Sequence, residues 1–324
     1  VDDGATWQSF QRNLPVTPVT DILVHQNDLV LSTMGRSFWI MDDLSPLHEA
    51  VAVGTPAFLF TPRNAARLRY SAGFGLSGGD DEASAEYPQP GTYFDYYLGA
   101  APSGEVTLDV LDAAGKVLRR FSSQDAGERL EGPEQPGMRG FELERTGTPR
   151  LPVTVGHHRV RWDFALPGPW GPGGGRGRGA SGPWVLPGGY QVRLTIGDWA
   201  ATRRFRITPD PRNAPSGVTV LDLQQQLQTA LATRDFLSDV RRFVATVAEA
   251  RKHDSSDRLA ALAKTLTAGP GRYPTPQLAE HAAYLYRMTL QADQRMGRDV
   301  TERLAELKGQ LAKAKTEFAG IRRP

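Results

Sequence analysis

Hydrophobic and polar residues alternate along the first 47 residues in short runs separated by turn-forming residues. The runs cover residues 20–26, 29–35 and 36–44, with Asn27 and Asp28 between the first two. Alternation with a period of two places successive side chains on opposite faces of a strand, and the close spacing favours antiparallel pairing. The pattern therefore predicts a small antiparallel sheet, which is too small to be stable alone.

A second group of alternating segments is rich in Gly and Pro and extends from about residue 55 to residue 213. Its clearest members are residues 91–100, 104–123, 157–166 and 188–210. Hairpin turns are predicted at Ala114-Gly115 and at Gly197-Asp198, inside two of these segments. We expect this part of the chain to form a β-sandwich.

From about Thr219 onward the hydrophobic period changes from two to nearly four, which is typical of amphipathic helices. The first helix is indicated by Leu223, Leu227, Leu231, Phe236, Val240, Phe243 and Val247. Ser255 and Thr275 suit the N-caps of later helices, and Gly269 with Pro270 suits a helix end. We expect a helical bundle or helical hairpin.

These patterns predict a mainly β plus α fold in three domains. They are a set of strands at 1–47, a β-sandwich at 48–213 and a helical domain at 214–324. A chain of 324 residues has room for domains of this size.

Composition and charge exclude some classes of function. The formal net charge of +2 gives no bulk attraction to nucleic acid, so we expect no nucleic-acid partner. Cysteine is absent, which removes thiolate nucleophiles and Cys-ligated metal sites. We expect no transmembrane segment, because the longest near-apolar run, AVAVGTPAFLF from Ala50, is too short and is interrupted by Gly and Pro.

The first residues, VDDGATW, resemble the Asp-box hairpin of the BNR and sortilin-type β-propellers. The following stretch, NLPVTPVTDILVHQNDLVLSTMGRSFWIMDDL, is similar to the closing blade of large bacterial secreted propeller proteins, often labelled glycosyl hydrolases. The resemblance implies a structural box of Asp2, Gly4, Thr6 and Trp7, in which Trp7 packs between sheets. It also implies a residual propeller blade, and we expect that the chain begins inside a hairpin.

The resemblance continues beyond this blade. LPGGYQVRLTI resembles a strand of the fibronectin-like module that follows the propeller in the same bacterial proteins. YLYRMT and ADQRMGRD are similar to the helical tail of that family, with Met296 where a Pro is common. The resemblance therefore covers nearly the whole chain, and it implies a fibronectin-like β-sandwich followed by a helical tail.

Two pairs of neighbouring residues are candidates for catalysis or for metal binding. A propeller active site draws residues from several blades, so one blade cannot assemble the paired carboxylates of a glycosidase. Neighbouring strand residues point to opposite faces, which argues against Asp42 with Asp43 as a catalytic pair and against His157 with His158 as metal ligands. We expect no catalytic residue, no metal site and no cofactor.

The stretch 168–184, GPWGPGGGRGRGASGPW, predicts a long loop because it has few apolar groups. Trp170 and Trp184 flank it, and Arg176 and Arg178 lie within it. Trp and Arg are favoured at protein interfaces, so these four residues are candidate interaction residues. The two tryptophans are alternatively anchors of the loop ends.

Together these patterns favour a non-catalytic structural or protein-interaction subunit that docks on a larger assembly, for which a membrane complex is one option. Basic residues cluster at 241–252 and 308–318, which most often indicates a solvated helix face; the alternatives are contact with an anionic membrane surface or with an acidic protein. One alternative is the C-terminal portion of a longer glycosidase-like or sialidase-like propeller enzyme. Another is a carbohydrate-binding module that uses Tyr93, Tyr96, Trp170 or Trp199. The resemblance implies a periplasmic or extracellular bacterial protein.

Overall fold

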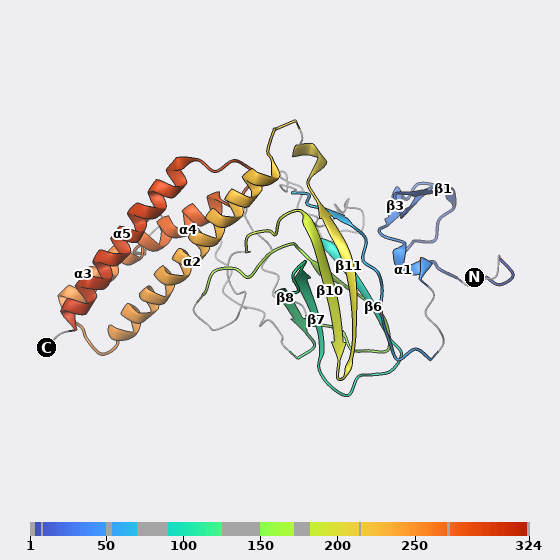
Figure 1. Cartoon of the computed structure of the whole chain (residues 1–324), viewed down its shortest axis with the longest axis horizontal. Helices are drawn as coiled ribbons and strands as arrows, with labels where there is room; N and C mark the ends of the chain where they lie inside the picture. The colour runs from blue at the N-terminus through green and yellow to red at the C-terminus, as the bar shows by residue number, and fades with distance from the viewer. Residues whose placement is uncertain are drawn as a thin grey trace.

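The computed structural model describes residues 4–7, 9–49, 54–69, 90–124, 150–171, 182–213, 215–270 and 273–322. The chain has a mixed β and α structure. In Figure 1 a small sheet, a larger β region and a group of helices follow one another along the long axis. We call these three parts the N-terminal sheet, the β body and the helical region.

The N-terminal sheet is an antiparallel meander of the described strands β1 (Val19–His25), β2 (Asp28–Thr33) and β3 (Phe38–Met41). His25 pairs with Asp28, so Gln26 and Asn27 form the turn, with φ of 48° and 68°. A two-residue turn with positive φ at both positions matches the twist of the flanking strands. The predicted turn at Asn27 and Asp28 is therefore wrong by one residue. The short helix α1 (Ser45–His48) follows the sheet.

The described strands of the β body form two sheets. The larger has the order β5-β11-β10-β7-β8 and the smaller the order β4-β6-β9. Their bounds are β4 (Ala57–Leu59), β5 (Ala65–Ala66), β6 (Thr92–Leu98), β7 (Val106–Asp112), β8 (Val117–Ser122), β9 (Gly156–Trp162), β10 (Gly188–Ile196) and β11 (Trp199–Thr208). Gly197 and Asp198 join β10 to β11, as the sequence predicted, and Gly197 has the positive φ that such a turn requires.

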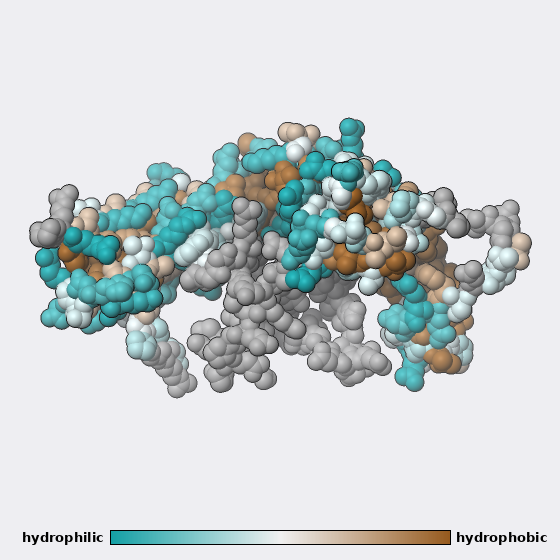
Figure 2. All heavy atoms as spheres, turned by 90° about the horizontal axis from the view of Figure 1, so that it is seen from below, coloured by the Kyte–Doolittle hydropathy of each residue, from teal (hydrophilic) through white to brown (hydrophobic). Residues whose placement is uncertain are grey.

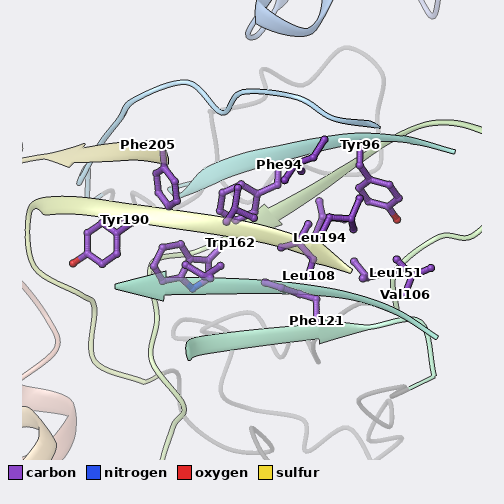
Figure 3. Close-up of a cluster of buried hydrophobic side chains, with 14 of the residues drawn as sticks. Phe94, Tyr96, Val106, Leu108, Phe121, Leu151, Trp162, Tyr190, Leu194 and Phe205 are labelled. Carbon is purple, nitrogen blue, oxygen red and sulfur yellow. The ribbon is translucent and has the colours of Figure 1, made fainter. Parts of the chain in front are cut away.

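Side chains from both sheets of the β body meet in one hydrophobic core. Trp162 lies at its centre and makes edge-to-face contacts with Phe164, Tyr190 and Phe205. Figure 3 shows the rings of Trp162, Tyr190 and Phe205 between strands of the two sheets, with Phe94 and Leu194 beside them. Burial of aromatic rings at this density is a main source of stability for a β domain.

The helical region has a hydrophobic core of its own. Its described helices are α2 (Val220–Ala250), α3 (Asp257–Leu266), α4 (Leu278–Met288) and α5 (Arg298–Ile321), and the 3-10 helix η1 (Pro211–Asn213) precedes them. Phe236, Val240, Phe243 and Val247 of α2 are buried against the other helices, as their spacing predicted. The N-caps of α3 and α4 are Ser256 and Gln277, so the predicted caps Ser255 and Thr275 are wrong by one and two residues.

Candidate interaction surfaces

The N-terminal sheet carries large hydrophobic side chains that solvent reaches. All seven residues of β1 are exposed. Phe38 and Ile40 of β3 are 73% and 61% exposed, and Leu23 of β1 is 57% exposed. Figure 2, which shows the molecule from below, has hydrophobic residues at the surface of this end beside hydrophilic ones.

The strand register places one apolar row on each face of the N-terminal sheet, and on one of the two faces polar residues of β1 and β2 flank the row. Residues that lie directly opposite in antiparallel strands share a face. Ile22, Leu31 and Trp39 form a row on one face, and Leu23, Val30 and Ile40 form a row on the other. An antiparallel sheet more often has one apolar and one polar face. Exposed apolar rows of this kind are one of the features found at protein–protein interaction sites.

Charged groups hold the N-terminal sheet to the β body. Arg159 of β9 donates from Nε to Oδ1 of Asp95 at 2.9 Å, and its other nitrogens donate to the backbone oxygens of Asp42 and Asp43 at 3.0 and 3.2 Å. Arg63 donates to Asp28 at 2.5 Å. We call this group of Asp28, Asp42, Asp43, Arg63 and Arg159 the charged neck. Burial, followed by the nearby charge of Asp28, raises the pKa of Asp42 above its ordinary value.

Asp42 and Asp43, the candidate catalytic pair that the sequence argued against, lie after β3 rather than in a strand. Asp43 has a φ of 60° and is 5% exposed. Its backbone N–H donates to Asp28 at 2.9 Å, and its carboxylate accepts from the backbone N–H of Ser45 at 3.0 Å. The carboxylate of Asp43 therefore shapes the turn into α1, which is a structural use of this side chain.

The candidate residues Trp170 and Trp184 lie where the β body meets the helical region. Trp170 donates its backbone N–H to Oγ of Ser238 at 3.0 Å and accepts from Arg241 at 3.1 Å, so it is fixed on α2. Trp184 stacks under the guanidinium groups of Arg67 and Arg69, at 5.4 and 4.1 Å from the ring centre. Both tryptophans thus anchor their segments inside the chain. Arg176 and Arg178 lie outside the described residues.

The structural box implied by the resemblance is described in part. Gly4 has a φ of 87°, a conformation that other residues rarely adopt. Trp7 is 88% exposed and lies over Gly4, so the expected packing of Trp7 between sheets is not seen. Thr6 is exposed, and Asp2 lies outside the described residues.

The histidines weighed as metal ligands point apart, as adjacent strand residues must. His157 lies 2.9 Å from Asp95, and His158 contacts the backbone oxygen of Thr154 at 2.6 Å. Within the described ranges, no group of three or more His, Asp or Glu side chains is arranged to hold a metal ion.

The aromatic residues that are candidates for stacking on sugars differ in how accessible their side chains are to a ligand. Tyr96 is fully buried and donates its hydroxyl to the backbone oxygen of Pro152 at 2.6 Å, so it is unavailable to a ligand. Burial raises the pKa of this hydroxyl. Tyr93 lies beneath Arg159, and Trp199 packs against the core of the β body. The idea of a carbohydrate site on Tyr96 is therefore wrong.

Sequence reasoning missed the residues that join the three parts. Arg159, Arg67, Arg69 and Asp293 are held at these junctions. A charged residue at an alternate strand position looks solvent-facing in the sequence, and its distant partner has no local signal. None of the described helices is long and apolar enough to cross a bilayer.

Comparisons with protein-family models, with curated proteins and with solved structures found no match to this chain. The likeness to bacterial Asp-box propeller proteins therefore stays a prediction that rests on the residues quoted for it.

Proposed function

We propose that this chain is a non-catalytic interaction subunit of a secreted or periplasmic bacterial assembly, and that the N-terminal sheet is its docking element. The observation that carries the proposal is the pair of apolar rows, one on each face of that sheet. Burying Phe38, Ile40 and Leu23 against a partner would gain the hydrophobic free energy that they lack in the isolated chain.

The kind of partner follows from the shape of the docking element. A sheet with an apolar row on each face fits between two apolar surfaces, as a propeller blade fits between its neighbours. We therefore infer that the N-terminal sheet is a residual blade and that its partner presents apolar sheet faces on either side. In this proposal the β body is a fibronectin-like sandwich and the helical region is a bundle, and both carry the docking element.

A double substitution on one face tests the proposal. Phe38→Asp with Ile40→Asp places two charges on a face that the proposal buries. The matched control is Val155→Asp, because Val155 is 59% exposed and lies on the β body. The assembly is isolated in mild detergent from cells that carry a photo-crosslinking residue in place of Leu23, which shares the face.

We expect the unsubstituted chain and the Val155→Asp control to crosslink to the same defined partner and to run as one large complex. The double variant should lose both the crosslink and the complex. Retention of the complex by the double variant would contradict docking through this sheet. Turnover of a sugar or peptide by the purified chain alone would contradict the non-catalytic assignment.

The same two apolar rows favour a second proposal, in which the covering surfaces belong to the same polypeptide. The 324 residues would then be the C-terminal portion of a longer propeller enzyme. The intact mass of the natural protein separates the two proposals. A mass near 35.4 kDa supports a separate subunit, and a much larger mass supports the longer enzyme.

A further inference from the structure

The β body and the helical region have separate hydrophobic cores, and none of the described residues belongs to both. The chain connects the two regions through residues 209–219, between β11 and α2. The contacts that the two regions make elsewhere include hydrogen bonds, ion pairs and cation–π contacts. Regions that meet through polar contacts tend to move relative to each other unless specific contacts hold them.

Asp293, in the turn between α4 and α5, makes the most buried of these contacts. Its side chain is 3% exposed and forms ion pairs with Arg67 and Arg69 of the β body. The Nε of Arg69 lies 2.7 Å from its Oδ1, and Nδ2 of Asn213 donates to its Oδ2 at 3.1 Å. One carboxylate from the helical region is thus held by the β body and by the connecting segment.

The two arginines are themselves fixed in place. Arg67 donates from Nε to the backbone oxygen of Val185 at 2.9 Å, and Arg69 donates from Nη1 to that of Leu290 at 2.8 Å. Both guanidinium groups lie over Trp184. Burial and the neighbouring charge of Arg67 lower the pKa of Arg69, which reflects how closely two cations are held here. Asp293 supplies the negative charge between them.

The rest of the turn joins two further elements. Gln294 donates its backbone N–H to Oε1 of Gln226 in α2 at 3.2 Å. Arg295 donates from Nη2 to the backbone oxygen of Gly217 in the connecting segment at 2.7 Å. The stretch Asp293–Gln294–Arg295 therefore contacts the β body, α2 and the connector in succession, which gives the ADQR part of the ADQRMGRD motif a physical role.

A second contact lies farther along α2, away from the turn. Trp170 of the β body bonds to Ser238 and Arg241, and Arg242 lies over its ring at 5.7 Å. Arg241 and Arg242 point to a neutral backbone oxygen and to an aromatic face, respectively. These contacts to Trp170 are made with neutral groups, whereas Asp293 and Arg67 form an ion pair in which both side chains are buried.

We propose that the helical region is a movable arm of this protein, latched in the observed position by Asp293 between Arg67 and Arg69. Loss of the carboxylate leaves two buried cations facing each other, and their repulsion opens the junction. The arm then turns about the connector between β11 and α2, of which residues 209–213 and 215–219 are described. This inference does not depend on the proposed docking of the N-terminal sheet.

A distance measurement in solution tests the latch. The chain has no cysteine, so Thr202→Cys on β11 and Ala312→Cys on α5 provide two unique sites for spin labels at exposed positions. Distances between the labels are compared in otherwise unsubstituted protein, in Asp293→Asn and in the control Asp239→Asn. Asp239 lies on α2, is 57% exposed and pairs with Arg242 at 3.4 Å.

We expect the distance distribution of Asp293→Asn to broaden and to shift to longer distances, with far-UV circular dichroism unchanged. The Asp239→Asn control should match the unsubstituted protein. If Asp293→Asn does not fold, Arg69→Gln replaces it, because this variant removes two bonds of the latch while Arg67 stays paired with Asp293. We then expect a smaller shift to longer distances, which comes from the lost bonds and not from repulsion. Unchanged distances in the folded variant, or an equal change in the control, would overturn the latch.

Discussion

The N-terminal sheet and the β body are built from the same kind of strand and differ in what covers them. Phe38 in β3 is 73% exposed, whereas Phe94 in β6 is fully buried. Both side chains come from alternating segments of similar hydrophobicity. Alternation of hydrophobic and polar residues is therefore enough to specify a strand, whereas burial of its side chains requires a second sheet that packs against it.

The physical difference is the opposing sheet. In the β body the ring of Phe94 meets the edge of Phe205, which comes from the other sheet, at 5.3 Å between centres. Burial on this scale contributes a large hydrophobic free energy and restricts each ring to one packing (Figure 3). The N-terminal sheet instead meets the β body at the charged neck, where its backbone oxygens accept from Arg159.

The largest effect that tests this comparison is the truncation of Phe94. Phe94→Ala removes a buried ring and leaves a cavity, which destabilises a protein by about 3–5 kcal/mol. We expect a loss of this size in urea denaturation followed by tryptophan fluorescence. A loss similar to that of an exposed phenylalanine would mean that the two sheets of the β body are not closed on each other.

A smaller effect is expected from two carboxyl groups, Asp109 of the β body and Asp42 of the charged neck. Their contributions to the pH dependence of stability have opposite signs. Asp109 is 1% exposed, and burial acts to raise its pKa. Hydrogen bonds from Arg120 and Arg193, at 2.6 to 2.9 Å, outweigh burial and hold the pKa of Asp109 below its usual range. The pKa of Asp42 is raised.

A carboxyl group with a lowered pKa stabilises the folded state above its unfolded pKa of about 3.9 and loses this contribution as the pH falls through the folded pKa. Asp109→Asn should therefore destabilise the protein at neutral pH, and the difference should shrink on acidification. Asp42→Asn should have a much smaller effect of the opposite sign at neutral pH, because ionisation of a carboxyl with a raised pKa opposes folding and Asp42 is exposed to solvent. Urea midpoints between neutral and acidic pH measure both signs, and equal signs would contradict the comparison.

The smallest effect is expected in the N-terminal sheet. Phe38→Ala changes an exposed side chain, and such substitutions alter stability by about 0.5 kcal/mol or less. Urea denaturation of this variant beside Phe94→Ala compares one residue type in two strands. A loss as large as that of Phe94→Ala would show that the isolated chain buries Phe38 in solution.

Particular residues show which features of the fold the local sequence pattern predicted. The spacing of Phe236, Val240, Phe243 and Val247 predicted the buried side of α2, because a helix repeats its faces at a fixed interval. The hairpin at Gly197 was predicted because few residues tolerate its positive φ. The N-cap of α4 was missed at Gln277, where Glu280 accepts from the Gln277 backbone and completes a capping box.

For the candidate interaction residues, too, the sequence showed the chemistry of the side chains but not their surroundings. Trp170 and Trp184 were selected for their chemistry, and the structure gives both of them partners within the chain. The apolar character of residues 20–44 was visible in the sequence, but its exposure was not. Exposure depends on whether another segment covers a face, and alternation carries no information about that.

The sequence by itself determined the mixture of strands and helices, the glycine turn at Gly197 and the apolar positions of α2. Each depends on backbone preferences and on periodicity within a few residues. Only the tertiary structure decided that Phe94 is buried while Phe38 is exposed, and that Asp293 lies between Arg67 and Arg69. Such contacts join residues that are far apart in the chain, so their energies depend on packing and desolvation that no local pattern contains.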